Sequence, residues 1–365
     1  MGLLNCEMRP FEKCIKKVKY TNKIANKDFK KGGRFPIVSQ EEVFISGYWD
    51  NPADVFHVKS PVVIFGDHSR HIKYVDFDFV IGADGVKILA PVEDIDAKYL
   101  YYYLRNLRIK SLGYSRHYKV LKEMSVPVTS MIEQRRIVAE LDLLSGIIEK
   151  KNAQLRTLDE LANTIFYEMF GNPDDSPYDI KPLSKLSQFK LAYGSGASAV
   201  DYNGLVRYIR ITDIEEGGTL TNAPMSPDTF DEKYLLNDGD ILFARSGATV
   251  GKTYLYKKTE GKAIFAGYLI RFIPDERIVL PEYIYYFTRS QYYRSFVRLN
   301  AQAVAQPNIN AQQYGGLKVS VPPMPLQKSF AKKIASINCQ KEIIMLSVKS
   351  AQQLLESRMN SYFSI

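Results

Sequence analysis

The stretch from Ile132 to Phe170 carries a long heptad pattern of apolar residues. Its positions are spaced alternately four and three residues apart, with one lysine among them: Ile137, Leu141, Leu144, Ile148, Lys151, Leu155, Leu158, Ala162, Ile165 and Met169. This spacing predicts an α-helix with a single seam that faces a partner helix. At about 1.5 Å per residue the helix would exceed ~50 Å, which is longer than a small domain is wide. We therefore interpret it as a spacer rather than as a core element.

A second helix of the same kind is predicted from Gln327 onward. The heptad returns there at Phe330, Ile334, Ile337, Lys341, Ile344, Val348, Ala351, Leu355, Arg358 and Tyr362. In an antiparallel pairing, position 137 faces position 362, and the two seam lysines avoid each other. We predict this antiparallel coiled coil, with a seam made of Ile137, Leu141, Leu144, Ile148, Leu155, Leu158, Phe330, Ile334, Ile337, Ile344, Val348 and Leu355. The alternative, in which each helix packs on its own domain, stays open.

The segments before the two helices repeat each other. Tyr99–Tyr103 overlies Tyr283–Phe287 at an offset of 184, and Gln134 matches Gln327 at an offset of 193. Each segment mixes short apolar strand candidates with an aromatic helix. We therefore predict an α+β fold with a pseudo-twofold internal repeat, in four parts: a mixed α/β domain at 1–130, a long helix at 131–171, a second mixed α/β domain at 172–325 and a second long helix at 326–365.

The charge of the chain favours a polyanionic partner. The formal net charge is +9, and the range from Arg9 to Arg34 contains ten basic residues and two acidic ones. A charge run of this kind is most often a solvated surface. The more specific interpretation is a face that binds a polyanion. The 25 tyrosines and a pI near 9.1 favour nucleic acid over a membrane surface.

No sequence motif of catalysis or metal binding is complete. The segment Arg245–Thr253 resembles a phosphate-binding loop, but Ser246 stands where that loop requires glycine. The four histidines lack cysteine or carboxylate at ligand spacing, and the three cysteines are too scattered for a disulfide framework. We expect a reducing, cytoplasmic location, and we predict that the chain catalyses nothing and holds neither a metal nor a cofactor.

Polar loops in both domains are suited to contact bases and phosphates. Arginine pairs with guanine, asparagine and glutamine pair with adenine, and lysine pairs with phosphate. The tyrosine runs at 99–103 and 283–287 fall at helical spacing and are interpreted as core. The candidate DNA-binding residues are His68, Arg70, His71, Lys73, Arg116, His117, Lys119, Arg207, Arg210, Arg245, Ser246, Lys252, Gln306, Asn308 and Asn310.

Four segments together resemble the DNA specificity subunit of type I restriction–modification systems. They are Val126–Ile137, Asp238–Gly247, Gln306–Asn310 and Val321–Gln327, in an order that spans nearly the whole chain. The first domain departs from the family pattern, because Phe65–Arg70 replaces its Gly-Asp-Ile-Leu form. Lys328–Phe330 likewise replaces the usual Arg-Ile after Gln327.

The resemblance implies a set of partners. Each α/β domain would be a target-recognition domain that reads one half of an asymmetric, bipartite site in double-stranded DNA. The long helices would set the spacing and dock two methyltransferase subunits, and restriction or motor subunits can join. S-adenosylmethionine and ATP are expected on those partner subunits, in a prokaryotic cytoplasm.

Two other functions remain alternatives. The first is an adaptor that joins other proteins through its coiled coil, and the second is a free-standing nucleic-acid enzyme built around Gly247–Thr253.

Overall fold

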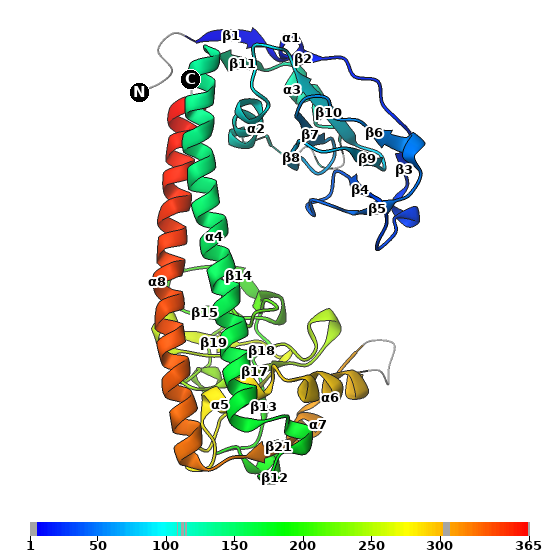
Figure 1. The fold of residues 1–365 in the computed structure, drawn as a ribbon. Helices are drawn as coiled ribbons and strands as arrows, with labels where there is room; N and C mark the ends of the chain where they lie inside the picture. The colour runs from blue at the N-terminus through cyan, green and yellow to red at the C-terminus, as the bar shows by residue number, and fades with distance from the viewer. Residues whose placement is uncertain (1–5, 108, 111–112, 114, 302–306, 364–365) are drawn as a thin grey trace. The chain divides into compact units, whose positions relative to one another are not determined.

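The computed structural model describes residues 6–107, 109–110, 113, 115–301 and 307–363. The chain divides into two compact units: unit 1 comprises Met1–Ala153 and Met345–Ile365, and unit 2 comprises Gln154–Ile344. Two helices of 40 residues each, α4 (Met131–Phe170) and α8 (Met324–Phe363), contribute to both units (Figure 1). The two long helices predicted from the heptads are therefore confirmed.

Unit 1 combines short strands with three short helices. In its described part the strands pair in the orders β1-β11, β2-β10-β7-β8 and β3-β9-β4-β5, with β6 also on β9. Helix α2 packs against β7 and β8. The elements are β1 (Glu7–Pro10), α1 (Phe11–Cys14), β2 (Ile15–Lys16), β3 (Lys23–Ile24), β4 (Phe35–Val38), β5 (Gly47–Trp49), β6 (Val55–Phe56), β7 (Val62–Gly66), β8 (Ile72–Val75), β9 (Phe79–Gly82), β10 (Val86–Pro91), α2 (Ala97–Asn106), α3 (Tyr118–Lys122) and β11 (Ser125–Val128).

Unit 2 follows the same plan. Its strands pair in the orders β12-β21, β13-β20-β17-β18, β14-β16 and β15-β19 among the described residues. Helix α5 packs against β18. The elements are β12 (Asp179–Pro182), β13 (Ala192–Tyr193), β14 (Ala199–Asp201), β15 (Arg207–Ile209), β16 (Met225–Pro227), β17 (Ile241–Ala244), β18 (Thr253–Leu255), β19 (Ala263–Phe265), β20 (Leu269–Phe272), α5 (Pro281–Phe287), α6 (Gln291–Ala301), α7 (Ala311–Gly315) and β21 (Lys318–Val321).

The central four-stranded sheets of the two units correspond strand by strand. β10, β7 and β8 of unit 1 take the places of β20, β17 and β18 of unit 2, and neighbouring strands run antiparallel. β7 and β17 are buried along their whole length, which accounts for their uninterrupted apolar sequences. Each unit also contains parallel pairing, of β3 and β4 with β9 in unit 1 and of β15 with β19 in unit 2. The internal repeat is thus a repeat of topology.

A buried glutamine ties each long helix to its domain. The side chain of Gln134 is fully buried; its Nε2 donates to the carbonyls of Asp94 and Thr129 at 2.9 and 2.8 Å, and its Oε1 accepts from Asp96 N at 2.8 Å. Gln327 is buried equally and makes the same three bonds, with Ile278 O at 3.1 Å, Pro322 O at 2.8 Å and Leu280 N at 2.8 Å. The matching glutamines in the sequence therefore have one structural role.

The aromatic helices form the core of each unit. Tyr99 of α2 and Tyr283 of α5 are buried, and their hydroxyls donate to the carbonyls of Pro127 and Ser320, both at 2.7 Å. These carbonyls lie on the strands that lead into α4 and α8. The prediction that the tyrosine runs are core residues is therefore confirmed.

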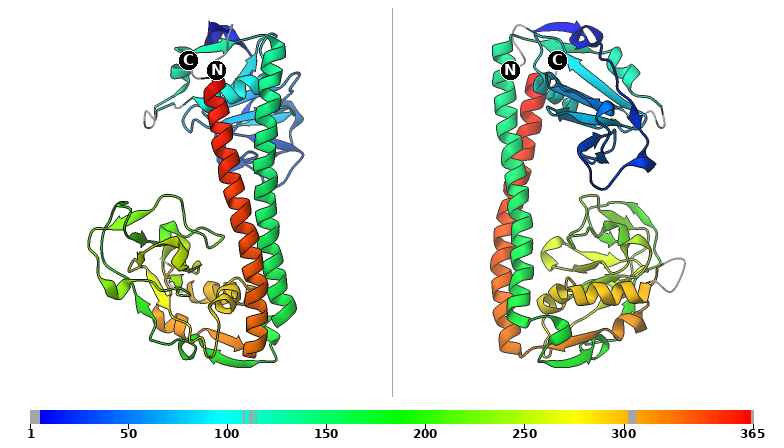
Figure 2. Two further views of the ribbon diagram at one scale, coloured as in Figure 1. Left: turned by 90° about the vertical axis from the view of Figure 1, so that its left-hand side faces the viewer. Right: turned by 45° about the vertical axis from the view of Figure 1, so that its right-hand side comes forward.

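Within each unit, a segment of α4 pairs antiparallel with a segment of α8 (Figure 2). In unit 1, Glu140 of α4 accepts from Tyr362 Oη at 2.6 Å and lies 3.0 Å from Arg358 Nε. In unit 2, Lys341 Nζ donates to Asp159 Oδ1 at 2.5 Å. The predicted antiparallel pairing is confirmed.

The predicted seam residues line this pairing to different degrees. Seven of them are buried by more than nine-tenths: Ile137, Leu141, Phe330, Ile334, Ile337, Val348 and Leu355. The others, near the middle of the helices, are half-buried: Leu144, Ile148, Leu155, Leu158 and Ile344. The helices also pack on the globular parts, because Ile137 and Leu141 share a cluster with residues of α2.

At the last turns of both helices the pattern of burial departs from the heptad. Arg358 and Tyr362 contact Glu140 of α4, as expected for the seam, but the side chains buried beyond Leu355 are Met359 and Phe363. α4 ends the same way, at Ala162, Phe166 and Phe170. The four-residue spacing turns these side chains toward the aromatic helices: Phe363 lies 5.3 Å from the ring of Tyr99, and Phe170 lies 4.9 Å from that of Tyr283.

The described helices include none that is both long enough and apolar enough to cross a membrane.

We predict that Gln327→Leu destabilises the chain by about 2 kcal/mol or more, because two carbonyls and one N–H lose their partner in a buried site. Denaturant unfolding of the full chain measures this effect. Gln353 lies exposed on the same helix, so Gln353→Leu is the matched control and should change the unfolding free energy by less than about 0.5 kcal/mol. Equal effects of the two substitutions would contradict the role of Gln327.

Candidate nucleic-acid interface

In unit 2 a hairpin turn meets the segment that precedes a short helix. The turn connects β17 to β18 and spans 245–252, and the segment 307–310 leads into α7. Gly247 N donates to Pro307 O at 3.0 Å, and Ile309 N donates to Arg245 O at 2.8 Å. Ser246 and Asn308 form an antiparallel bridge between them. The structure therefore brings Arg245, Ser246 and Asn308 together, as the predicted interface requires.

Arg245 is held on two sides of its guanidinium group. The group lies over the ring of Tyr193, with its carbon atom 4.7 Å from the ring centre. Its Nε donates to Asn308 Oδ1 at 3.3 Å. Among the described residues, no hydrogen bond is formed by its terminal nitrogens Nη1 and Nη2, and the side chain is half-buried. This is a planar cation with a fixed orientation and two donor groups that the described chain does not use.

Lys252, at the other end of the turn, contacts the protein itself. Its Nζ lies 3.0 Å from Glu216 Oε1 and donates to Ile214 O at 3.3 Å. Gly251 has φ +87°, and a Cβ there would lie 2.6 Å from Val297 of α6. The glycine-rich turn therefore allows close packing on α6. The strand β18 follows it directly.

Three other predicted residues of unit 2 form hydrogen bonds with their own unit. Arg210 pairs with Asp213 at 2.7 Å, and hydrogen bonds to that carboxylate raise the pKa of the guanidinium. Arg207 Nη2 donates to Thr221 O at 2.7 Å. Asn310 caps α7, and its side chain accepts from Gln313 N at 2.9 Å. Gln306 lies outside the described residues. These contacts favour structural roles for Arg207, Arg210 and Asn310.

Unit 1 builds the equivalent turn differently. The turn follows β7 at Asp67, whose carbonyl accepts from His117 N at 2.8 Å, and the segment before α3 thus meets the turn as it does in unit 2. Asp67 is buried, and its Oδ1 accepts from Tyr118 N at 2.7 Å. Asp67 therefore occupies the place that Arg245 has in unit 2.

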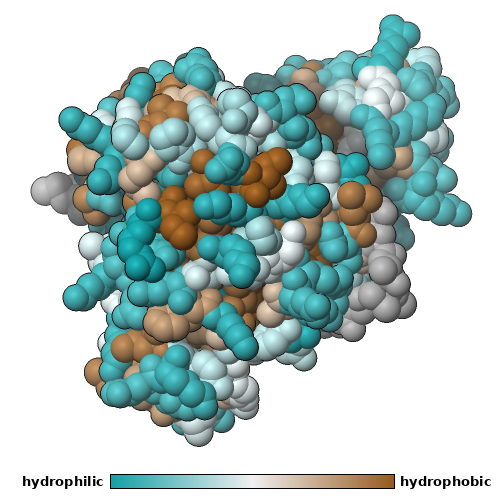
Figure 3. All heavy atoms as spheres, turned by 90° about the horizontal axis from the view of Figure 1, so that it is seen from below, coloured by the Kyte–Doolittle hydropathy of each residue, from teal (hydrophilic) through white to brown (hydrophobic). Residues whose placement is uncertain are grey.

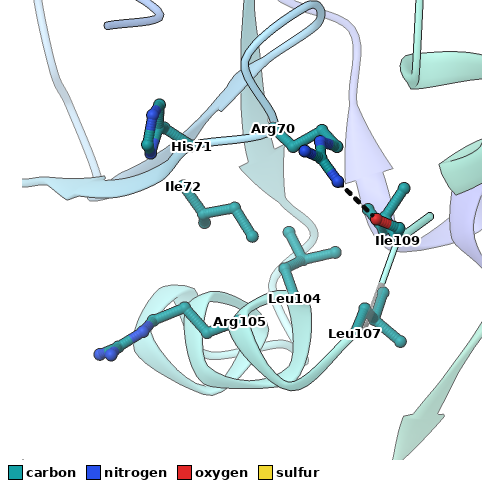
Figure 4. A pocket seen from close by; sticks show the side chains of 7 residues that line it. All are labelled: Arg70, His71, Ile72, Leu104, Arg105, Leu107 and Ile109. Carbon is teal, nitrogen blue, oxygen red and sulfur yellow. Dashed lines mark hydrogen bonds between the residues drawn. The ribbon is translucent and has the colours of Figure 1, made fainter. Parts of the chain in front are cut away.

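The basic residues of this first turn border a shallow pocket of about 340 Å³ (Figure 4). Arg70 is exposed, has the left-handed φ of +66°, and its Nη1 donates to Ile109 O at 2.9 Å. The lining consists of Arg70, His71, Ile72, Leu104, Arg105, Leu107 and Ile109. His68 and His71 are exposed, as are Arg116 and Lys119 on either side of His117.

Two predicted residues of unit 1 are buried. Lys73 on β8 is 5% exposed, and its Nζ donates to Ser39 O at 2.9 Å and to Val43 O at 2.6 Å. Burial lowers the pKa of its ammonium group to about 8. His117 is fully buried, and its Nδ1 lies 3.0 Å from Asp67 O. Their positions favour structural roles over contact with DNA.

The basic segment between Arg9 and Arg34 is mostly exposed. Nine of its ten basic side chains have more than a third of their surface accessible: Lys13, Lys16, Lys17, Lys19, Lys23, Lys27, Lys30, Lys31 and Arg34. In the described structure, Lys16 pairs with Glu93 and Lys30 with Asp50. The other seven exposed cations form no ion pair among the described residues.

Sequence reasoning missed Tyr193 and Asp67. Tyr193 belongs to a strand of two residues, which carries no periodic signal, and it meets Arg245 only because β13 pairs with β20 next to β17. Asp67 follows a strand and precedes histidine and arginine residues, so it reads as an ordinary turn residue. Long-range pairing, rather than local pattern, gives both residues their role.

The chain is similar to known proteins over most of its length. Residues 197–346 match a family model described as the type I restriction modification DNA specificity domain. The specificity subunit of the type I restriction enzyme EcoR124I/EcoR124II of Escherichia coli is 24% identical over 290 residues, which is 73% of this chain and 70% of that protein. The MjaVIII specificity subunit of Methanocaldococcus jannaschii is 20% identical over 263 residues, 66% of this chain and 60% of that protein.

A solved structure has a similar fold. It is the type I restriction-modification system S subunit from M. genitalium, with a TM-score of 0.58 and 15% sequence identity. The alignment covers 98% of this chain and 96% of that one.

We predict that Lys73→Met lowers the free energy of unfolding by about 1–3 kcal/mol, because its carbonyl partners lose a charged donor. Thermal or denaturant unfolding measures this. Lys119→Met removes the same charge from an exposed position and should leave stability within about 0.5 kcal/mol of the original. A stable Lys73→Met chain that no longer binds DNA would show that Lys73 contacts DNA instead.

Proposed function

We propose, from the premise that this chain belongs with the type I restriction–modification specificity subunits, that it reads an asymmetric bipartite DNA sequence through its two units. In this role it positions methyltransferase subunits, and restriction subunits where they are present, on the site. We assign no chemical step to the chain itself.

One observation carries the proposal: the same scaffold occurs twice with different side chains at the same turn. In both units the residue after the buried strand accepts a backbone hydrogen bond at 2.8 Å from the segment before a short helix. That residue is Asp67 in unit 1 and Arg245 in unit 2. The same backbone arrangement with different side chains at the turn supports the reading of two unlike half-sites by one chain.

The repeat also supports two copies of one partner. Gln134 and Gln327 fix the start of each long helix to its domain with the same three bonds. We infer two equivalent docking surfaces for two methyltransferase subunits, which would hold S-adenosylmethionine; ATP would belong to a restriction subunit. Apolar residues also reach the surface between hydrophilic ones (Figure 3). On the long helices the exposed large apolar residues are Ile132, Leu143, Leu161, Tyr167, Ile343, Met345, Leu346 and Leu354.

We further propose that the long helices set the spacing between the two half-sites. Both helices pass without interruption from the residues of one unit to those of the other. A helix has a fixed rise per residue, which makes it a suitable spacer.

The test is co-expression of the chain with its methyltransferase partner, followed by mapping of methylated adenine across the host genome. We expect a single asymmetric motif of two specified parts separated by unspecified bases. Methylation that requires this chain but shows no sequence preference, or a complex that forms without DNA affinity, would instead favour a coiled-coil adaptor. Nucleotide hydrolysis by the purified chain that disappears in Lys252→Ala would favour a free-standing enzyme.

We predict that the triple substitution of Lys19, Lys27 and Lys31 by glutamine weakens the salt dependence of DNA binding by the complex. Each phosphate that is no longer neutralised should reduce the slope of log K against log salt by about 0.9, giving at most about 2.7 for three phosphates. The methylated motif should stay the same, because phosphate contacts carry no base information. Binding titrations at several salt concentrations measure the slope.

The matched control removes the same charge from α8, through glutamine at the exposed residues Lys328, Lys332 and Lys333. If both triple variants lower the slope equally, the basic segment of unit 1 has no special role in binding.

A further inference from the structure

We infer that Arg245 reads a guanine in the half-site bound by unit 2, and that Tyr193 and Asn308 are the positioning residues that aim it. This inference rests on the proposed function, and it names the base and the residues that function requires.

The plane of the Arg245 guanidinium group is restrained by an aromatic ring. Tyr193 lies below it, with the ring centre 4.7 Å from the guanidinium carbon. The hydroxyl of Tyr193 accepts from Ala311 N at 3.1 Å, at the start of α7. The ring is therefore fixed at both ends, by strand β13 and by that hydrogen bond. Stacking on an aromatic face sets the plane of an arginine side chain without using its donors.

The unused donors of Arg245 are the two terminal nitrogens of the guanidinium group. Nε is occupied by Asn308 Oδ1 at 3.3 Å. The backbone on both sides of this pair is also fixed, because Ile309 N donates to Arg245 O and Arg245 N donates to Tyr268 O. Nη1 and Nη2 of Arg245 are therefore available to a partner outside the described chain. Two parallel N–H donors match the O6 and N7 acceptors of guanine in the major groove.

Other partners of an arginine fit this arrangement less well. Adenine presents one acceptor and one donor at the same edge, so it would leave one of the two donors unpaired. Arginine can also bind a phosphate with two donors, but a phosphate does not require donors held in one plane, because the point charge of a lysine binds it too. A guanidinium group held in one plane therefore favours contact with a base, and with guanine in particular. Phosphate contact is the alternative outcome that the experiment must separate.

Unit 1 has a different residue at the equivalent turn. At the equivalent place Asp67 is buried, and its carboxylate accepts from Tyr118 N. Because an aspartate rather than an arginine follows the buried strand there, the guanine assigned to Arg245 belongs to one half-site only.

The experiment uses the complex of the full chain with its methyltransferase partner and a library of DNA duplexes randomised at each position of the mapped motif. Arg245→Lys keeps the charge and removes the planar fork. We expect the preference for guanine to fall by roughly 5- to 150-fold, the value of one bidentate contact, at a single position, while the other positions keep their preferences.

Tyr193→Leu tests the positioning role, because it removes the ring and leaves Arg245 in place. Relaxed preference at that same position is expected, with assembly of the complex unchanged. The matched control is Phe230→Leu. Phe230 is also 42% exposed in unit 2, and Lys262 lies 4.5 Å from its ring centre; this variant should keep the full motif.

The outcomes separate the inference from the function on which it rests. If the unaltered complex has no motif, the proposed function fails. If it has a motif but Arg245→Lys weakens binding to all sequences alike or not at all, Arg245 contacts phosphate or nothing, and the inference is overturned. Relaxed preference in Arg245→Lys but not in Tyr193→Leu would overturn the positioning role alone.

Discussion

The two buried glutamines are the constraint on which the rest of the structure depends. Each one joins three backbone groups at the point where a strand leaves a domain and a long helix begins. Because Gln134 and Gln327 are fully buried, these bonds form without competition from water. The direction of α4 relative to α2, and of α8 relative to α5, is therefore fixed by the same polar contact. The backbone arrangement that carries each candidate interface is attached to its long helix by these glutamine hydrogen bonds.

The main features of the fold could be predicted from the sequence, because they are periodic or repeated. The heptads specified two long helices, and the offset between Gln134 and Gln327 specified the repeat. The last turns could not be predicted, since the burial of Met359 and Phe363 depends on what lies beside α8 rather than on its own pattern. Phe363 packs on Tyr99 of α2, and an aromatic neighbour distant in sequence outweighs the heptad there.

The candidate interface was harder to predict, because a basic side chain has the same sequence signature whether it faces solvent or the fold. Lys73 and Arg210 were predicted from their charge, yet one donates to backbone carbonyls and the other pairs with Asp213. Arg245 was predicted for the same reason, and it keeps two donor groups that the described chain does not use. The difference arises from long-range strand pairing, which places Tyr193 beneath Arg245 and which no local pattern reveals.

A duplicated frame separates stability from specificity. The groups that hold the frame are the same in both units: a buried glutamine, a buried tyrosine and a carbonyl that accepts from the segment before a short helix. The side chain at that carbonyl differs between the units: Asp67 is buried and accepts from Tyr118 N, whereas Arg245 lies over the ring of Tyr193. In unit 2 a substitution of Arg245 changes what the turn presents, while the backbone hydrogen bond of Arg245 O to Ile309 N does not depend on the side chain. Two copies of such a frame on one chain can therefore diverge independently, which is the physical condition for reading an asymmetric site.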